Sequence, residues 1–244
     1  MIATADNCNP MLELFKEEGE RRRHWEADLI ILKELWQPLI RALLATFNQR
    51  DTQRPWSLCV YGGTLSGKTT FFNHAIDVFR EYKHLDRYGI IKITCLTNST
   101  LKGIYKDILM GLNWPFNTRD SIQDLEVLVG DAVQKRECKL IIIDEFNQLY
   151  NKGDGIRVAE VLKALRNIPN RTLRPLVVVG TMTVQPLLKH DRETNSRFRK
   201  IEFPHFESSG VKWDIFREAV YALDQNLKEA TGICSNFANR KSVL

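Results

Sequence analysis

The stretch Gly62-Gly63-Thr64-Leu65-Ser66-Gly67-Lys68-Thr69 fits the pattern G-x-x-x-x-G-K-[S/T]. It follows the apolar run Ser57–Tyr61 and opens the amphipathic stretch Lys68–Tyr82, so it joins an expected strand to an expected helix, as the pattern requires. Backbone N–H groups of such a loop turn inward around a phosphate, and the helix N-terminus adds the positive end of its dipole. The stretch therefore predicts a nucleotide-phosphate site in an α/β protein.

Individual residues of this loop have separate expected roles. Lys68 should reach the β- and γ-phosphates, the Thr69 hydroxyl should bind Mg²⁺, and Thr70 should lie near the α-phosphate. The expected cofactors are thus ATP and Mg²⁺, bound by residues Gly62 to Thr70. A glycine-rich turn that carries Lys-Thr by chance is the alternative.

A second motif lies at Lys139-Leu-Ile-Ile-Ile-Asp144-Glu145, an apolar run that ends in two acids. Asp144 is the expected partner of Thr69 in holding Mg²⁺, and Glu145 is the candidate base that orients an attacking water. An acidic pair after a strand is often only a solvated loop. Together with the phosphate loop, however, it favours hydrolysis of ATP to ADP and phosphate.

Two further positions complete the expected catalytic set of Lys68, Glu145, Thr181 and Arg197. Thr181 follows the apolar run Leu176–Gly180, next to the expected γ-phosphate position, although it could instead cap the helix that begins near Val184. Arg197 precedes the last expected strand, where an arginine can reach the ATP of a neighbouring subunit. A surface arginine without a role is the alternative there.

Short apolar runs alternate with amphipathic stretches from Trp56 onward, which is typical of βα repeats around a parallel sheet. Runs that are apolar at every position indicate strands covered on both faces. We therefore expect a three-layer αβα sandwich. The expected strands are Ser57–Tyr61, Ile90–Cys95, Leu140–Ile143, Leu176–Gly180 and Lys200–Phe203. The expected helices are Lys68–Tyr82, Leu101–Asn113, Ser121–Arg136, Gly155–Ile168 and Val184–Lys189, with a polar helix ending near Arg197.

The two ends of the chain are expected to be helical. Residues 1–55 read as an N-terminal helical segment in which Pro38 should kink or split the helix. Residues 56–206 read as the ATPase core. Residues 207–244 read as a short or truncated lid that starts with a helix over Val211–Leu227.

The composition of the chain fits a packed globular domain, with 244 residues, 43% hydrophobic and 27% charged. No apolar run is long enough to cross a membrane, and no signal segment is recognisable, so we expect a cytoplasmic protein without membrane contact. Its five cysteines contain no C-x-x-C pair and predict neither a disulfide framework nor zinc. A net charge of +5 permits nucleic-acid contact without requiring it.

The motifs above, together with Val-Val-Gly-Thr181, Asp191, Arg197-Phe198 and Phe203-Pro204, resemble the TniB/TnsC AAA+ ATPases of transposons. The likeness covers roughly Ile30 to Leu227. It implies a bacterial, sequence-nonspecific DNA-binding ATPase that assembles with ATP into rings or filaments on duplex DNA and directs a DDE transposase to its target. In CRISPR-associated members a TniQ-type adaptor and a guide-RNA effector are further partners. By this resemblance Thr181 is the sensor 1 position and Arg197 the arginine finger.

Two segments are candidates for DNA contact, because phosphate binding needs hydroxyls, cations or helix N-termini and not base readout. One runs from Thr97 to Lys102 and includes Thr100, Lys102 and, on the following helix, Lys106. The other contains Thr118 and Arg119. An ordinary helix cap at Ser99 or Thr100 beside a solvated lysine face is the alternative.

Two other functions stay open at the level of sequence. A helicase loader of the IstB and DnaC type would share both nucleotide motifs and the finger. A small-molecule phosphotransferase would make Asp144-Glu145 and Arg197 incidental. The basic cluster Arg21 to His24 follows three glutamates, so it forms helix-face ion pairs as readily as it binds a partner.

Overall fold

A computed structural model describes residues 33–96, 100–149 and 155–205, together with Trp213, Asp214, Arg217, Glu218, Val220 and Tyr221. The chain divides into two compact units, one formed by Ala42–Phe203 and the other by residues up to Arg41 with those from Pro204 onward. The larger unit holds every element that bears on the nucleotide motifs. Of the expected lid helix, the six residues named above are helical, and the remainder lies outside the described residues.

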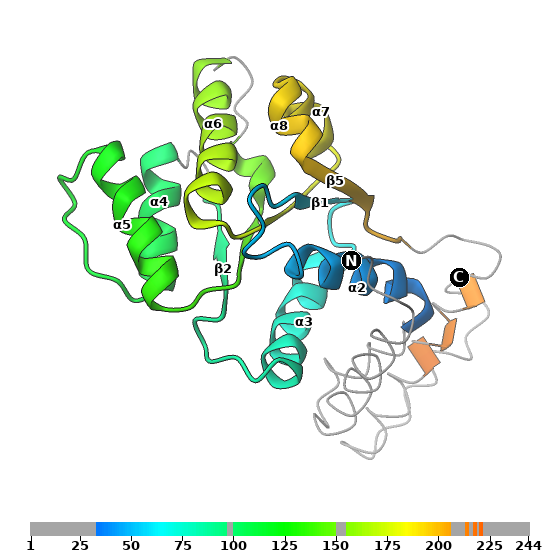
Figure 1. Cartoon of the computed structure of the whole chain (residues 1–244). Coiled ribbons are helices and arrows are strands. Elements are labelled where there is room, and N and C mark those ends of the chain that lie inside the picture. Colours follow the sequence, from blue (N-terminus) through cyan, green and yellow to red (C-terminus); the bar gives the residue numbers. More distant parts are fainter. Residues whose placement is uncertain are drawn as a thin grey trace. The chain divides into compact units, whose positions relative to one another are not determined.

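Five parallel strands form one sheet in the order β2-β3-β4-β1-β5 (Figure 1). They are β1 (Ser57–Tyr61), β2 (Ile90–Thr94), β3 (Leu140–Asp144), β4 (Leu176–Gly180) and β5 (Phe198–Glu202). The predicted five-stranded parallel sheet is confirmed. Since β1 lies beside β4, and β4 beside β3, the loops after these three strands meet at one edge.

The last strand begins two residues earlier than the sequence predicted. Phe198 is already in β5, is 5% exposed and pairs with Ser57, whereas Phe203 lies beyond the strand. The Phe203 N–H still donates to the Tyr61 carbonyl at 2.7 Å. The predicted strand is present, but its predicted bounds of Lys200–Phe203 were wrong, because the preceding helix ends at Arg197 and the buried Phe198 side chain joins the sheet at once.

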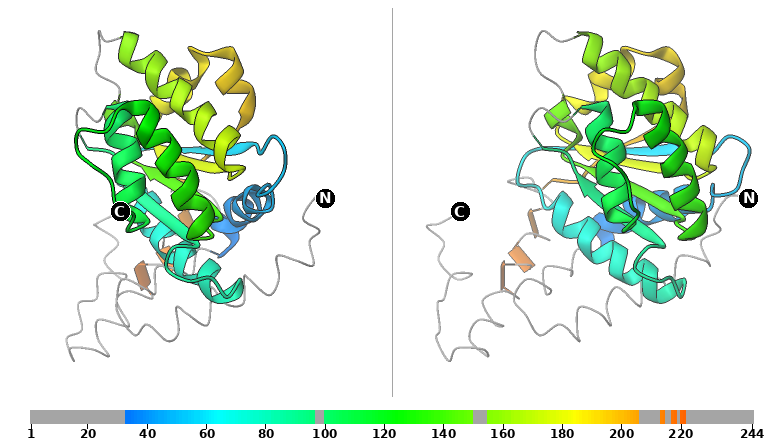
Figure 2. Two further views of the ribbon diagram at one scale, coloured as in Figure 1. Left: turned by 60° about the vertical axis from the view of Figure 1, so that its left-hand side comes forward. Right: turned by 90° about the vertical axis from the view of Figure 1, so that its left-hand side faces the viewer.

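Helices cover both faces of the sheet and make the predicted three layers (Figures 1 and 2). They are α3 (Lys68–Tyr82), α4 (Leu101–Gly111), α5 (Ile122–Lys135), α6 (Gly155–Thr172), α7 (Val184–Lys189) and α8 (Arg192–Arg197), with a 3₁₀ turn η3 (Phe146–Leu149). Residues of α4, α5, α6 and α7 share a core with alternate residues of the strands, such as Ile141 and Ile143. The side chain of Phe71 on α3 packs on Phe203 with ring centroids 5.9 Å apart.

Two prolines lie inside helices that the sequence predicted to be broken or shorter. The helix α2 (Lys33–Phe47) continues through Pro38 without being split. Buried side chains after Pro38, among them Leu39 and Ile40 at 1% exposure each, offset the lost backbone bond. Likewise α6 passes Pro169 and ends at Thr172, whose hydroxyl donates to the Ile168 carbonyl at 2.7 Å.

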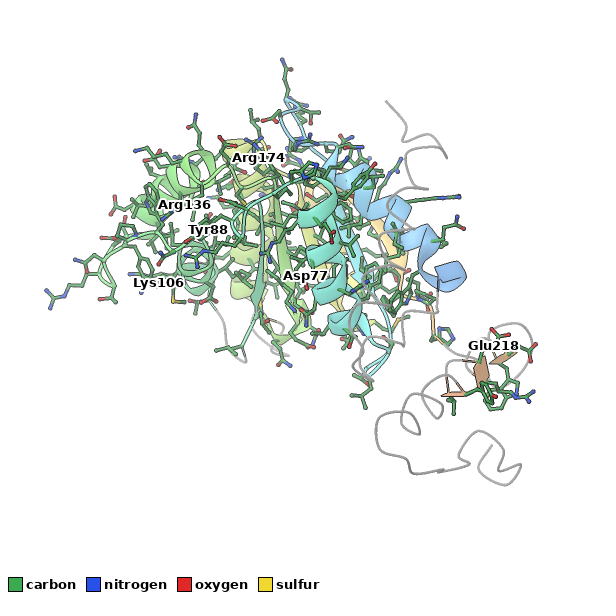
Figure 3. All side chains as sticks on the ribbon, turned by 90° about the horizontal axis from the view of Figure 1, so that it is seen from below. Asp77, Tyr88, Lys106, Arg136, Arg174 and Glu218 are labelled. Atoms are coloured by element: carbon green, nitrogen blue, oxygen red, sulfur yellow. The ribbon has the colours of Figure 1, made fainter. Side chains whose placement is uncertain are left out.

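Arginines close the edge of the sheet at which the strands begin (Figure 3). Arg174 donates from Nε to the Cys138 carbonyl at 2.8 Å and pairs with Asp51. Arg136 lies 4.5 Å over the ring of Tyr88 and donates to the Asn113 carbonyl at 3.0 Å. These side chains tie the turns at this edge to the core, away from the nucleotide motifs.

Within the described part of the chain, no helix is both long and apolar enough to cross a membrane. The three described cysteines, Cys59, Cys95 and Cys138, are buried thiols, and burial raises the pKa of each to about 12. Cys8 and Cys234 lie outside the described residues.

Candidate nucleotide site

The loop between β1 and α3 has backbone angles that only certain residues tolerate. Gly67, directly before α3, has φ of 88°, in the left-handed region that favours glycine. A Cβ at Gly62 would lie 3.0 Å from Cβ of Phe203, so Gly62 permits the close packing of loop and β5 exit. Leu65 at the loop tip is fully exposed. The glycines thus allow the sharp turn into α3 and the close packing of the loop on Phe203.

The Lys68 ammonium lies over this loop. Its Nζ donates to the carbonyls of Gly62 and Gly63 at 3.3 and 2.5 Å and to the Ser66 hydroxyl at 3.0 Å. Lys68 is 8% exposed. Burial lowers the pKa of its ammonium, whereas the charges of Glu145 and Asp144 raise it. A buried cation held by the loop is suited to binding phosphate oxygens.

Thr69 and Asp144, 75 positions apart in sequence, meet in space. The Thr69 hydroxyl donates to Oδ2 of Asp144 at 3.1 Å. The other carboxylate oxygen accepts the N–H of Glu145 at 2.9 Å, and Asp144 is 2% exposed. A hydroxyl and a carboxylate in contact at the end of the phosphate loop are the hard oxygen donors that Mg²⁺ prefers. The residues therefore fit the predicted cation.

Lys92 brings a second ammonium to this place. Its Nζ lies 3.6 Å from Oδ2 of Asp144 and also hydrogen-bonds Oδ1 of Asn73 on α3. Sequence reasoning missed both residues. The one available signal was a lysine within the otherwise apolar run Ile-Ile-Lys-Ile of β2, which indicates that its charge has a partner nearby in the fold.

Glu145 follows β3 in a left-handed backbone conformation, with φ of 54°. The N–H bond to Asp144 and a bond from the Gln148 N–H to its carbonyl at 2.9 Å hold this turn. Its carboxylate accepts from the side-chain amide of Asn147 at 3.3 Å. A non-glycine residue in this region carries strain that recurs at functional sites.

Thr181 comes to the same edge through the neighbouring strand β4. Its N–H donates to Oδ1 of Asn147 at 3.0 Å, and its hydroxyl is 2.9 Å from that of Thr183. The N-cap of α7 is Thr183, so the side chain of Thr181 does not cap that helix. Asn147 thus links Thr181 with Glu145.

Arg197, the last residue of α8, contacts groups of its own chain. Its guanidinium donates to Oδ1 of Asn170 at 2.5 Å and to Oε1 of Glu193 at 2.7 Å. Glu193 also pairs with Arg166 at 2.5 Å. Arg199, the other arginine of this segment, stacks 4.4 Å over the ring of Trp56. In this chain, then, Arg197 is held near the helix end and does not meet the phosphate loop.

The family model described as Bacterial TniB protein matches residues 21–208, more than half of the chain. The chain belongs to the TniB family. A comparison with curated proteins gave no match.

Solved structures resemble this TniB chain in fold. Cdc6p of Pyrobaculum aerophilum has a TM-score of 0.52 and 17% identity, over 82% of this chain and 49% of that one. ORC2 of Aeropyrum pernix in its ADP form has a TM-score of 0.57 and 18% identity, over 79% and 51%. Drosophila ORC bound to AT-rich DNA and Cdc6 gives 0.56 and 12%, over 88% and 35%. The fold is that of an AAA+ P-loop NTPase, and the chain spans about half the length of the archaeal chains it matches.

The two candidate DNA segments lie side by side. Lys106 on α4 donates to the Thr118 carbonyl at 3.0 Å, while Thr118 and Arg119 are exposed. The Thr100 hydroxyl accepts the Gly103 N–H at 3.1 Å and caps α4, which is the structural role left open by the sequence. Lys102 is half-buried in the first turn of that helix. Thr97, Asn98 and Ser99, like the Arg21 to His24 cluster, lie outside the described residues.

Proposed function

We propose that this TniB protein is a Mg²⁺-dependent ATPase that assembles on duplex DNA without sequence preference and directs a transposase to its target. The observation that carries the ATPase part of the proposal is the contact of Thr69 with Asp144, 3.1 Å long, beside the loop that holds Lys68; the transposase part rests on membership of the TniB family. A hydroxyl, a carboxylate and an ammonium at the end of a parallel sheet are the groups that bind Mg²⁺ and the phosphates of a nucleoside triphosphate.

Each residue then has a defined task in hydrolysis. Lys68 exchanges its loop carbonyls for phosphate oxygens, and Thr69 with Asp144 holds the cation. Bound Mg²⁺ would neutralise charge that develops on the phosphate oxygens. Glu145, next to Asp144, accepts a proton from the attacking water and orients it. Thr181 lies at the neighbouring strand end, where its hydroxyl can meet the γ-phosphate.

Arg197 supports a mechanism shared between subunits. It sits at a helix end and is held by Glu193 and Asn170, so a neighbouring copy with bound ATP would have to compete for its guanidinium. Such a finger adds positive charge to the transition state, for a gain of roughly 10³ to 10⁵ in rate. ATP binding and assembly would thereby depend on each other.

DNA binding is supported by the adjacent positions of Lys106, Thr118 and Arg119, and by a similar fold in Drosophila ORC bound to DNA. Cations and backbone near a helix N-terminus bind phosphates regardless of base sequence. Arg119→Ala should weaken DNA binding equally on unrelated sequences and reduce its salt dependence, with ATP binding unchanged. Lys135→Ala, an exposed lysine on α5, is the matched control.

Electron microscopy with duplex DNA and a non-hydrolysable ATP analogue tests the whole proposal, with each ligand omitted in turn. Rings or filaments that require both ligands support it. Discrete monomers under every condition would contradict it. If the assembled protein then bound a replicative helicase and no transposase, the helicase-loader alternative would be favoured.

A further inference from the structure

Asn147 contacts two functional positions with the two ends of one side-chain amide. Its Nδ2 donates to Oε2 of Glu145 at 3.3 Å, and its Oδ1 accepts the N–H of Thr181 at 3.0 Å. Thr181 is 34 residues further along the chain, on a different strand. One side chain therefore joins the expected base to the strand end that carries the expected sensor.

The surroundings of Asn147 fix its amide. It lies in the 3₁₀ turn η3, behind Phe146, which is fully buried. On the β4 side, a Cβ at Gly180 would come within 2.7 Å of Oδ1 of Asn147, 3.2 Å of its backbone nitrogen and 2.5 Å of Cγ2 of Val184. The glycine leaves the space that the amide occupies. The turn η3 and the end of β4 therefore pack closely against each other at Asn147.

The Glu145 carboxylate depends on this contact. Among the described residues, Asn147 is the one whose side chain hydrogen-bonds it. The backbone of Glu145 is already fixed by Asp144, so the remaining freedom lies in its side chain. An extended side chain with a single hydrogen bond samples other rotamers once that bond is removed.

We infer that Asn147 is the positioning residue of the hydrolytic reaction: it holds the Glu145 carboxylate and couples its position to Thr181. The inference rests on the proposed ATPase function and deepens it. A displacement of Thr181 when its hydroxyl contacts the γ-phosphate would be transmitted through Asn147 to Glu145. The base would then be aligned only when the triphosphate is complete.

The competing explanation is structural: an asparagine that caps a short turn and contributes only to stability. The two roles predict different behaviour, because a positioning residue acts through Glu145 and a capping residue does not. Asn147→Asp separates them further. It keeps an oxygen that accepts the Thr181 N–H, but it cannot donate to Glu145 and places a like charge beside it.

The test uses the full chain with Mg²⁺, ATP and duplex DNA. It compares wild type with Asn147→Ala and Asn147→Asp, and with Gln148→Ala from the same turn as the control. We expect kcat to fall roughly 10- to 100-fold in both Asn147 variants, the loss that a misplaced catalytic group causes. The Kd for ATP should stay within about twofold, since the groups that bind nucleotide are intact. The urea midpoint of Asn147→Asp should remain close to that of wild type.

The double variant Glu145→Gln/Asn147→Ala is the decisive arm. It should be no slower than Glu145→Gln alone, since Asn147 acts through Glu145. Additive losses, or an unchanged or raised kcat in Asn147→Asp, would overturn the positioning role. If wild type hydrolysed no ATP, the proposed ATPase function would be wrong, and the inference with it. If wild type and the Asn147 variants hydrolysed ATP at equal rates, only the positioning role of Asn147 would be wrong.

Discussion

At the scale of single residues, the charge of Lys92 competes with the cation that Thr69 and Asp144 are proposed to hold. Its ammonium lies 3.6 Å from Asp144, and its side chain is 18% exposed. A unit charge a few ångströms away costs a bound cation on the order of 1 kcal/mol in water, roughly a fivefold change in affinity. Lys92→Met should therefore lower the Mg²⁺ concentration at half-maximal ATP hydrolysis about fivefold.

Lys139→Met is the matched control for this titration, because its side chain is 23% exposed and lies at the beginning of β3, at the far edge of the sheet. It should leave the Mg²⁺ requirement unchanged. A higher requirement in Lys92→Met would show that Lys92 supports the metal site and does not compete with it.

The contacts of Lys92 and Asn147 illustrate what the sequence can predict at this scale. Lys68, Thr69 and Asp144 could be predicted because their motifs have fixed spacing. Lys92 and Asn147 could not, because their roles depend on which strands are neighbours and on a helix face meeting a strand. Neither fact is encoded in local pattern. The contact of Thr69 with Asp144 could be predicted although the two residues are far apart in sequence, because each motif is expected to bind the same Mg²⁺ ion.

At the scale of elements, Asp191 determines where the helix of Arg197 begins. Its carboxylate caps α8 by accepting the Thr194 N–H at 3.1 Å, and Arg166 lies 3.4 Å away. Asp191→Ala should destabilise the protein by about 1 kcal/mol, as other lost N-caps do. It should also slow hydrolysis, because α8 carries Arg197, the proposed arginine finger. Urea unfolding and phosphate release measure the two effects.

Ser121→Ala is the control, since Ser121 caps α5 through the Asp124 N–H at 3.2 Å and lies in no proposed site. It should cost similar stability without slowing hydrolysis. Equal rates in both variants would contradict the link between α8 and catalysis.

The Asp191 cap also makes the stability of the folded chain depend on pH. The Thr194 hydroxyl and N–H, with Arg166, lower the pKa of Asp191 below its ordinary value of 3.8. The unfolded chain therefore binds this proton more readily than the folded one. The stabilisation is complete above pH 3.8 and is lost as the pH falls through the lowered value. Asp191→Ala should remove this part of the acid dependence.

The bounds of the helices and strands show which parts of the fold the local sequence pattern predicts and which it does not. The strands β1 and β4 and the helices α3 and α7 begin and end where the sequence predicted. Gly62 directly after β1 and Gly180 at the end of β4 mark the ends of the two apolar runs. The bounds of β2, β3, α4 and α5 differ from the predicted ones by one or two residues. The other errors fall at Pro38, where the helix is not split, at Pro169 and at Phe198. There the burial of neighbouring side chains outweighs the local preference of the backbone, and burial is a property of the whole fold.

At the scale of the whole molecule, we propose that a second copy completes the nucleotide site. Arg197→Ala should abolish hydrolysis, and so should Lys68→Ala, which removes phosphate binding. A mixture should regain activity, because a Lys68→Ala subunit offers its intact Arg197 to the ATP of an Arg197→Ala subunit. The rate as a function of mixing ratio is the measurement. No recovery at any ratio would contradict a shared site.

The central claim is that this TniB chain hydrolyses ATP with Glu145 as the base, and Glu145→Gln tests it most directly. ATP binding and phosphate release are measured for this variant and for wild type with Mg²⁺ and duplex DNA. We predict ATP affinity within about twofold of wild type and a rate lower by roughly 10² to 10⁴, with assemblies on DNA that persist. Hydrolysis at the wild-type rate by Glu145→Gln would contradict the assignment.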